Sequence, residues 1–370
     1  GSMEREDIDM TFKRIAACAA AATSLWLGTA PIALSHTDLI VTNFGGTAAR
    51  AQMLALIMPW EAETGKTVEM EEYGGGIDEI RRQVMSANVK WDVIDFDPPD
   101  LIRACEEGLL EKINPNLIEN VEDFIPGAIH ECGIGNVVWA TVYAYNAETF
   151  DETTPTSIGD FFDLDAFPGK RGLWKTPRVA LEWALMADGV AAEDIYTVLA
   201  TPEGQDRAFA KLETIKSQIV WWSNGSQPAA LLESGEVAMS AAWNGRLYQP
   251  MQDGVPIEIV WDGQLWEIDF FGIPKGSRRL EAALEFIKYA TSEERMTEWS
   301  KLIPYGPSRA SAAAQVDKNI APLLPTSEAN TQNALRINSQ WWAENINAIQ
   351  PRFNAFIEEN EAAEERGSRF

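Results

Sequence analysis

Two short segments of this chain each place a Trp close to one charged residue. Trp243 is followed three positions later by Arg246, and Trp266 is followed three positions later by Asp269. A guanidinium grips a carboxylate through two parallel hydrogen bonds, a carboxylate pairs with an amine, and an indole face attracts an ammonium group. Facing one cleft, these groups would form a pocket for a small molecule that carries both charges. The alternative is that the Trp rings are core and that the two charges are solvated or paired with each other.

The charge of the whole chain limits its partners. Its 370 residues include 56 acidic and 30 basic side chains, which give a formal net charge of −26. Such a surface repels nucleic acid and anionic lipid, so we expect neither a nucleic-acid partner nor a peripheral-membrane role. A ligand that is cationic or carries no net charge is compatible with it.

The sequence lacks the motifs of common enzyme classes. His130 stands without a second His at metal-ligand spacing, and no G-x-S-x-G motif occurs. Gly65-Lys66-Thr67 resembles the end of a P-loop, but Trp60 occupies the position of its first glycine. We therefore expect no catalytic residue, no metal and no cofactor. An exported hydrolase that uses dispersed carboxylates is the alternative from another class.

The N-terminal segment predicts export. Two basic residues precede an apolar, Ala-rich run over 15–27, and the sequence Ala-Leu-Ser that ends at Ser35 matches a cleavage site. The mature chain would then begin near His36, and we assign 1–35 to the leader and the residues before it. A membrane helix is the competing interpretation, but the run is short for a span of about 20 apolar residues.

Cys105 and Cys132 would be the two cysteines of the mature chain. An even number of cysteines in an oxidising compartment is compatible with one disulfide between them. Two buried free thiols are the alternative, because the sequence does not give the Cα separation that a disulfide needs.

Strands and helices alternate along the first part of the mature chain. We expect strands at 38–43, 67–73 and 92–96, each followed by a helix, and a long helix near the C-terminus at 337–357, before a charged tail at 361–370. Short apolar strands that alternate with helices predict a mostly parallel sheet covered on both faces.

Ligands of such sheets bind at the carboxyl ends of the strands, beside the N-termini of helices. Phe44 and Gly45 follow the first expected strand, and Asp95, Phe96 and Asp97 end the third. We therefore place these residues at the edge of a cleft.

Five motifs follow one another in a specific order and spacing: Glu63–Val68 (ETGKTV), Trp91–Ile94 (WDVI), Gly108–Leu110 (GLL), Gly235–Gly245 (GEVAMSAAWNG) and Phe271–Gly276 (FGIPKG). Taken together, they make the chain similar to the periplasmic substrate-binding proteins of ABC importers, within the branch that binds spermidine and putrescine. The resemblance covers nearly the whole mature chain.

The resemblance implies an α/β fold with two lobes, the type II-like periplasmic binding protein fold. Each lobe would be a mostly parallel sheet flanked by helices, with the ligand cleft between the lobes. Lobe 1 would comprise 38–146 and 268–306, and lobe 2 would comprise 147–267 and 307–360. A periplasmic monomer of this kind would carry a small amine or amino-acid ligand to an inner-membrane ABC permease.

Departures from the polyamine-binding pattern point to a different ligand. The chain keeps the Trp and one acid of that pattern, as Trp243 and Asp269, but it has Arg246 where binders of the putrescine type often have an acid. The acids that these binders carry near the start of a helix in the second lobe are missing from 175–179, which reads KTPRV. A diamine would be repelled by Arg246, whereas a zwitterion could place its carboxylate there.

The same Trp, Arg and Asp resemble the site of γ-aminobutyrate-binding members of the branch. We therefore predict that the ligand is γ-aminobutyrate or a similar ω-amino acid. A polyamine or betaine ligand, with Arg246 turned away, is the alternative. Beside Trp243, Arg246 and Asp269, the resemblance implies these ligand-binding candidates: Phe44, Gly45, Asp97, Tyr305 and Trp342.

Overall fold

The structure is a computed structural model that describes residues 36–367. The predicted leader over 1–35 lies outside the described residues. No helix within them is both long enough and apolar enough to span a membrane. The C-terminal segment that was expected to be a tail is helical as far as Gly367.

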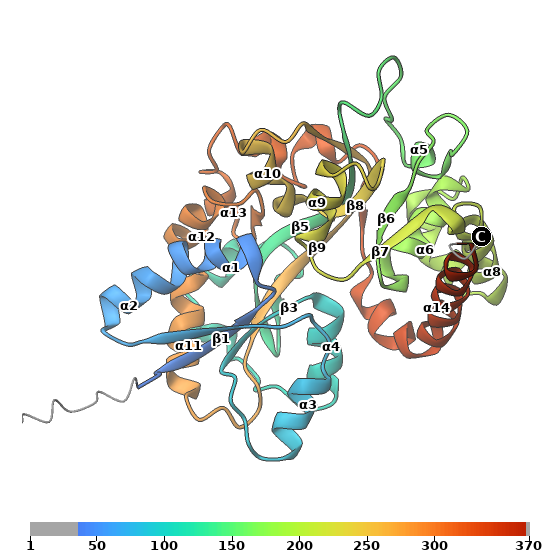
Figure 1. Ribbon diagram of the computed structural model, residues 1–370. Helices are drawn as coiled ribbons and strands as arrows, with labels where there is room; N and C mark the ends of the chain where they lie inside the picture. Colours follow the sequence, from blue (N-terminus) through green and yellow to red (C-terminus); the bar gives the residue numbers. More distant parts are fainter. Residues whose placement is uncertain (1–35, 368–370) are drawn as a thin grey trace, which may run out of the picture. The chain divides into compact units, whose positions relative to one another are not determined.

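A mixed sheet organises the described chain (Figure 1). Its strands are β1 (Leu39–Asn43), β2 (Val68–Glu72), β3 (Val93–Phe96), β4 (Ile129–His130), β5 (Gly133–Asn146), β6 (Arg171–Trp174), β7 (Ile219–Trp222), β8 (Met239–Trp243), β9 (Ile257–Gly272), β10 (Gly306–Pro307) and β11 (Leu335–Arg336). The order is β2-β1-β3-β9-β5-β8-β6-β7, with β4 and β10 beside β5 and with β11 beside β9.

Helices cover the sheet and connect its strands. They are α1 (Gly46–Gln52), α2 (Met58–Thr64), α3 (Asp78–Met85), α4 (Pro98–Glu106), α5 (Ile158–Phe162), α6 (Pro177–Ala187), α7 (Ile195–Leu199), α8 (Pro202–Glu213), α9 (Gln227–Glu233), α10 (Tyr248–Gln252), α11 (Leu280–Ala290), α12 (Glu293–Ser300), α13 (Ala310–Ala313) and α14 (Ser339–Gly367). A π-helical turn over Met53–Ile57 joins α1 to α2, so these two form one continuous helical stretch.

Two groups of parallel strands lie at opposite ends of the strand order. β1 pairs in parallel with β2 and β3, and β6 pairs in parallel with β7 and β8. The long strands β5 and β9 run antiparallel to each other between these groups and connect them (Figure 1). The α/β class with two parallel groups is as predicted, whereas the residue boundaries of the two lobes stay a prediction.

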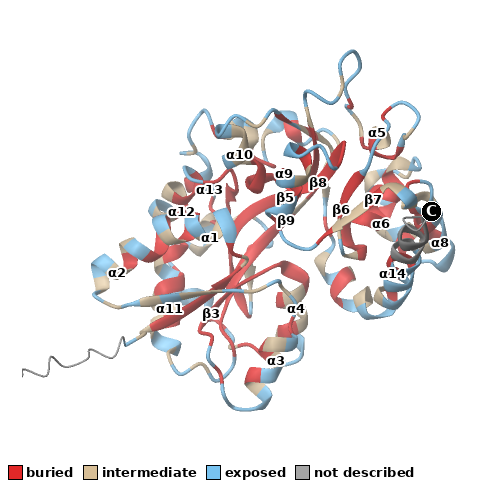
Figure 2. Cartoon of the chain, in the orientation of Figure 1, coloured by how far each residue is buried: buried red, intermediate tan, exposed pale blue. Residues whose placement is uncertain are grey.

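The core follows the strands. Every residue of β1 is buried, and its first three, Leu39–Val41, are apolar, which is typical of a parallel strand covered on both faces. The central strands are buried along most of their length, while the surrounding helices expose their outer faces (Figure 2). Asp97 begins α4 by accepting a hydrogen bond from the backbone N–H of Asp100, and Pro98 and Pro99 in the first turn need no donor there.

Cys105 in α4 and Cys132 before β5 form a disulfide, with their Cα atoms 5.9 Å apart. The bond closes a loop across a sequence separation of 27 residues. Linking residues this far apart restricts the unfolded chain and stabilises the fold by about 3 kcal/mol.

We expect the double substitution Cys105→Ser and Cys132→Ser to lower the free energy of unfolding by about 3 kcal/mol. Urea unfolding of the ligand-free protein measures this loss. Reduction of the wild-type protein is the matched control and should shift the transition by a similar amount. Equal stability with and without the bond would contradict the expectation.

Candidate ligand-binding site

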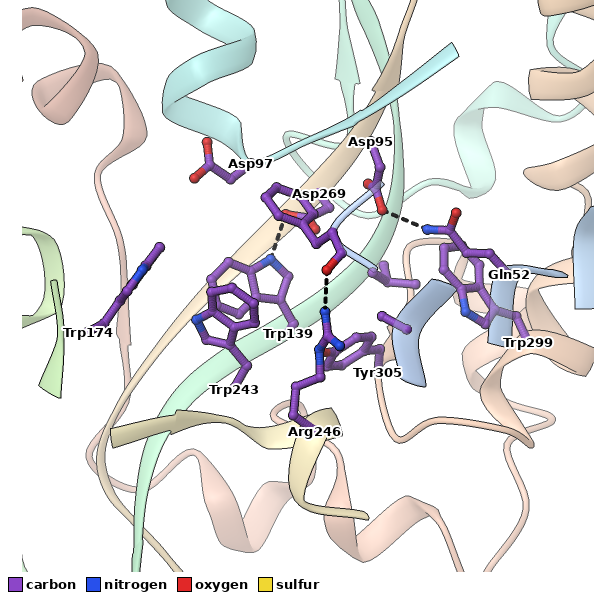
Figure 3. A pocket seen from close by; sticks show the side chains of 13 residues that line it. Gln52, Asp95, Asp97, Trp139, Trp174, Trp243, Arg246, Asp269, Trp299 and Tyr305 are labelled. Carbon is purple, nitrogen blue, oxygen red and sulfur yellow. Dashed lines mark hydrogen bonds between the residues drawn. The ribbon is translucent and has the colours of Figure 1, made fainter. Parts of the chain in front are cut away.

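A pocket lies where β3, β5, β8 and β9 meet the start of α1. The residues that line it and were predicted from the sequence are Phe44, Asp97, Trp243, Arg246, Asp269 and Tyr305. Asp95, which the sequence placed at the edge of the cleft, also lines the pocket. The lining residues that the sequence analysis did not name are Ala48, Gln52, Val137, Trp139, Trp174 and Trp299. Figure 3 shows these side chains converging from segments far apart in the sequence.

Aromatic rings form one wall of the pocket around Trp243, the last residue of β8. Trp139 and Trp174 meet the Trp243 ring edge to face, with centroids 5.8 and 5.2 Å from it. Phe44 meets it from the turn after β1, at 6.2 Å. Gly225 allows the close approach, since a Cβ there would lie 2.5 Å from the Trp243 ring. The wall is therefore rigid, and it suits an alkyl chain that ends in an ammonium group.

Arg246 lies on the short helical turn that follows β8 and is buried, with 4% of its surface exposed. Its Nη2 donates to the backbone oxygen of Phe44 at 3.0 Å, and its guanidinium lies 5.6 Å from the Trp243 ring centroid. Its Nε has no hydrogen-bond partner among the described residues, and its charge acts on Asp95 and Tyr305, both of which line the same pocket. A buried cation without an ion-pair partner is costly, so this guanidinium is suited to receive a carboxylate from a ligand.

Asp269 faces the same pocket from β9 (Figure 3). Trp139 Nε1 donates to its Oδ1 at 2.6 Å, and this is the one hydrogen bond found for the carboxylate among the described residues. Burial raises the pKa of Asp269 well above its usual range, and the neighbouring carboxylates of Asp95 and Asp97 raise it further. A cation beside Asp269 would stabilise the charged form, so the carboxylate is suited to an ammonium group.

Both carboxylate oxygens of Asp95 accept hydrogen bonds from side-chain amides. Its Oδ2 accepts from Gln52 Nε2 at 2.7 Å, and its Oδ1 accepts from Asn136 Nδ2 at 2.9 Å. Burial raises its pKa to about 7, against the effect of these two donors. Because both oxygens already have partners, Asp95 supports the pocket rather than offering a free acceptor.

Asp97 lines the pocket, but its carboxylate already has partners. One oxygen accepts from the backbone N–H of Asp100, and the other accepts from Arg178 Nη2 at 2.5 Å.

Tyr305 lines the pocket with its ring against Gly245, where a Cβ would lie 2.3 Å away. Burial raises the pKa of Tyr305 to about 12, so its hydroxyl is protonated at neutral pH.

Two candidates from the sequence lie outside the pocket lining. Trp342 is 1% exposed, donates to Glu182 at 2.6 Å, and lines a neighbouring cavity instead. Gly45 adopts φ +68° at the start of α1, and a Cβ there would lie 2.1 Å from the Glu72 carboxylate. Its contribution is to the turn that presents Phe44. Trp266, the neighbour of Asp269, lies under the guanidinium of Arg336, at 4.9 Å from its ring centroid.

The missed lining residues differ in how far the sequence could have indicated them. Trp174 ends β6 just before a helix, the same strand-end context that singled out Trp243, and that signal was available. Trp139 lies within β5, which is buried along nearly its whole length, so no alternation marks the face toward the pocket. Gln52 and Trp299 belong to helices whose packing on the sheet decides their position.

The raised pKa of Asp95 predicts a pH-dependent stability of the ligand-free protein. An unfolded Asp has a pKa of about 3.9, and the folded value of about 7 lies above it. The contribution of Asp95 to stability is therefore complete below about pH 4 and is lost as pH rises toward 7. We expect Asp95→Asn to flatten this fall, measured as melting temperature between pH 4 and 8. Identical slopes for variant and wild type would contradict the assignment.

The chain matches the family model for bacterial extracellular solute-binding proteins over residues 55–326. It is 40% identical over 319 residues to the gamma-aminobutyric acid-binding protein of Pseudomonas aeruginosa, covering 86% of this chain and 90% of that protein. A more distant relative is the spermidine/putrescine-binding periplasmic protein of Salmonella typhimurium, 22% identical over 65% of this chain and 69% of that protein.

Solved structures of similar proteins share the fold. The PBP MotA from A. tumefaciens B6, in complex with glucopine, superposes with a TM-score of 0.82 at 28% identity, covering 87% of this chain and all of that one. A GABA receptor superposes with a TM-score of 0.77 at 32% identity, covering 87% of this chain and 98% of that one. With its two parallel strand groups, its aromatic pocket and these matches, the chain belongs to the bacterial extracellular solute-binding proteins.

Proposed function

We propose that this protein binds γ-aminobutyrate or a closely similar ω-amino acid and delivers it to an ABC permease. One observation carries the proposal. Arg246 is a buried guanidinium whose Nε has no partner among the described residues, and it shares an aromatic pocket with the carboxylate of Asp269. A ligand that carries both a carboxylate and an ammonium group supplies the missing partner to each.

Each group in the pocket has a distinct task in this proposal. The Arg246 guanidinium, whose Nε lacks a partner, receives the carboxylate of the ligand. Asp269 receives the ammonium group, and the hydrogen bond from Trp139 holds the carboxylate of Asp269 in place. The Trp243 ring covers the methylene groups between the two charges. Each charged end of the zwitterion meets an opposite charge, because the carboxylate lies against Arg246 and the ammonium group against Asp269.

The related proteins support this class of ligand. A relative with 40% identity is a gamma-aminobutyric acid-binding protein, and a structural neighbour with 32% identity is a GABA receptor. The spermidine/putrescine-binding relatives are more distant, with identities of 21–22%. A polyamine would bring an ammonium group to Arg246, and burying two like charges together is unfavourable.

The setting of this function follows from the same proposal. The mature protein acts as a periplasmic monomer after removal of its leader, and closure of two lobes around the ligand creates the surface that the permease binds. The ligand is bound and released unchanged, without catalysis.

Titration calorimetry of the protein with γ-aminobutyrate, putrescine, spermidine and glycine betaine tests the proposal. We expect γ-aminobutyrate to bind tightest and putrescine at least about 100-fold more weakly, a difference of about 2.7 kcal/mol. Tight binding of putrescine without binding of γ-aminobutyrate would overturn the zwitterion assignment. Chemical turnover of any bound ligand, followed by NMR, would overturn the assignment as a binding protein.

A further inference from the structure

The N-terminus of α6 contains a strained turn. Val179 adopts φ +75° and ψ −54°, an outlier for a β-branched residue, and Arg178 before it is also non-helical. The buried carboxylate of Glu182 holds the turn by accepting from the Val179 N–H at 2.8 Å. Glu182 is itself fixed, because it accepts from Trp342 and Tyr196 at 2.6 and 2.9 Å. The surrounding structure therefore imposes this conformation.

The strained turn places the Arg178 side chain against the edge of the pocket. Its Nη2 donates to Asp97 at 2.5 Å and its Nη1 to Glu267 at 3.4 Å, and the group lies 4.9 Å from the Trp174 ring centroid. Arg178 is 6% exposed and Glu267 is 1% exposed. One guanidinium thus compensates two buried acids, and the second oxygen of Glu267 has no partner among the described residues.

This arrangement decides how many acids the pocket can offer to a ligand. Asp97 is paired with Arg178, and both oxygens of Asp95 accept from amide groups. Asp269, with its single bond from Trp139, is the acid left for an ammonium group. Without Arg178, the carboxylate of Asp97 would face the pocket without a cation, beside Asp269.

We infer that Arg178 is a specificity-determining residue that restricts the site to ligands with one amine, because its ion pair with Asp97 keeps that carboxylate from binding a ligand. The inference rests on the proposed function in that the ligand lies in this pocket. Arg246 repels a second ammonium group at one end of the pocket. At the other end, Arg178 pairs with Asp97, so this carboxylate cannot bind a second ammonium group. Arg178 lies in the segment where the sequence departs from the polyamine-binding pattern.

Calorimetry of Arg178→Gln with putrescine and γ-aminobutyrate tests this role. We expect the affinity for putrescine to rise at least tenfold over wild type, because Asp97 becomes free to bind the second amine. The conservative variant Arg178→Lys keeps the positive charge and should keep the wild-type preference. The double variant Asp97→Asn with Arg178→Gln should lose the gain. A folded Arg178→Gln protein that binds putrescine no better than wild type, or a gain that persists in the double variant, would overturn the inference.

If Arg178→Gln does not fold, Arg178→Gln combined with Glu267→Gln takes its place, because this pair also removes the second buried acid that Arg178 compensates and leaves Asp97 without a cation. We expect this variant, too, to bind putrescine at least tenfold more tightly than wild type. If Arg178→Gln with Glu267→Gln folds and binds putrescine no better than wild type, the inference is overturned. Failure of the proposed function is distinguishable, because it shows as absent binding of γ-aminobutyrate to the wild-type protein. A putrescine gain in Arg178→Gln that depends on Asp97 would still support the role of Arg178.

Discussion

Replacing Arg246 with Ala is expected to weaken the binding of γ-aminobutyrate at least about 100-fold, or about 2.7 kcal/mol. The guanidinium is buried, and its Nε has no partner among the described residues. A carboxylate that binds there gains charge-assisted hydrogen bonds, and the Ala variant leaves it buried without a counterion. Titration calorimetry measures the loss.

Putrescine is the matched control ligand for this variant. It carries no carboxylate, so Arg246→Ala should leave its binding unweakened or should strengthen it by removing a repulsive charge. Arg82→Ala is the control variant, since Arg82 is an exposed guanidinium on α3 that pairs with Glu79. Unchanged affinity of Arg246→Ala for γ-aminobutyrate would show that the carboxylate binds elsewhere.

Replacing Asp269 with Asn is expected to cost a similar factor of at least about 100 in affinity for γ-aminobutyrate. The Asn oxygen can still accept from Trp139 Nε1, so the variant removes the charge while the wall of the pocket stays in place. The ammonium group of the ligand then loses its anionic partner in a buried site. Calorimetry at neutral pH measures the effect.

Stability measurements separate this loss from misfolding. Burial raises the pKa of Asp269, so the ligand-free fold gains little from its charge, and Asp269→Asn should not lower the melting temperature. Asp78→Asn, at a side chain that is 96% exposed, should change neither stability nor affinity. Retention of wild-type affinity by Asp269→Asn would assign the amine to another acid of the pocket.

The sequence predicted the strands because their apolar runs are short and lie between clear turn residues. The expected strands at 38–43, 67–73 and 92–96 correspond to β1, β2 and β3 within one residue at each end. β9 was harder to predict. Gln264, Glu267 and Asp269 interrupt the apolar pattern between the segments 257–261 and 270–273. The structure joins these segments into one strand and pairs it with β5.

Those polar interruptions are tolerated because each one has a partner in the folded chain. Gln264 donates to backbone oxygens of the segment after β10, Glu267 accepts from Arg178, and Asp269 accepts from Trp139. All of these partners lie far away in the sequence. Hydrophobic periodicity therefore could not identify the strand that carries the acid of the site.

In the pocket, too, local sequence patterns identified some residues, whereas contacts between distant segments decide the positions of others. Trp243, Arg246 and Asp269 were predicted as a group, and the structure brings them together on the lining of one cavity. Asp97 was predicted as a possible ligand contact from its place after a strand, but its pairing with Arg178 depends on a strained turn that no local pattern shows. Trp342 was expected near the ligand, but its indole N–H donates a hydrogen bond to Glu182 instead.

The position of γ-aminobutyrate in a crystal structure of its complex with this protein tests the central claim most directly. The account predicts the carboxylate on the Arg246 guanidinium, the ammonium group on Asp269, and the methylene chain across the Trp243 ring. A ligand bound with its amine toward Arg246, or bound outside this pocket, would contradict the account.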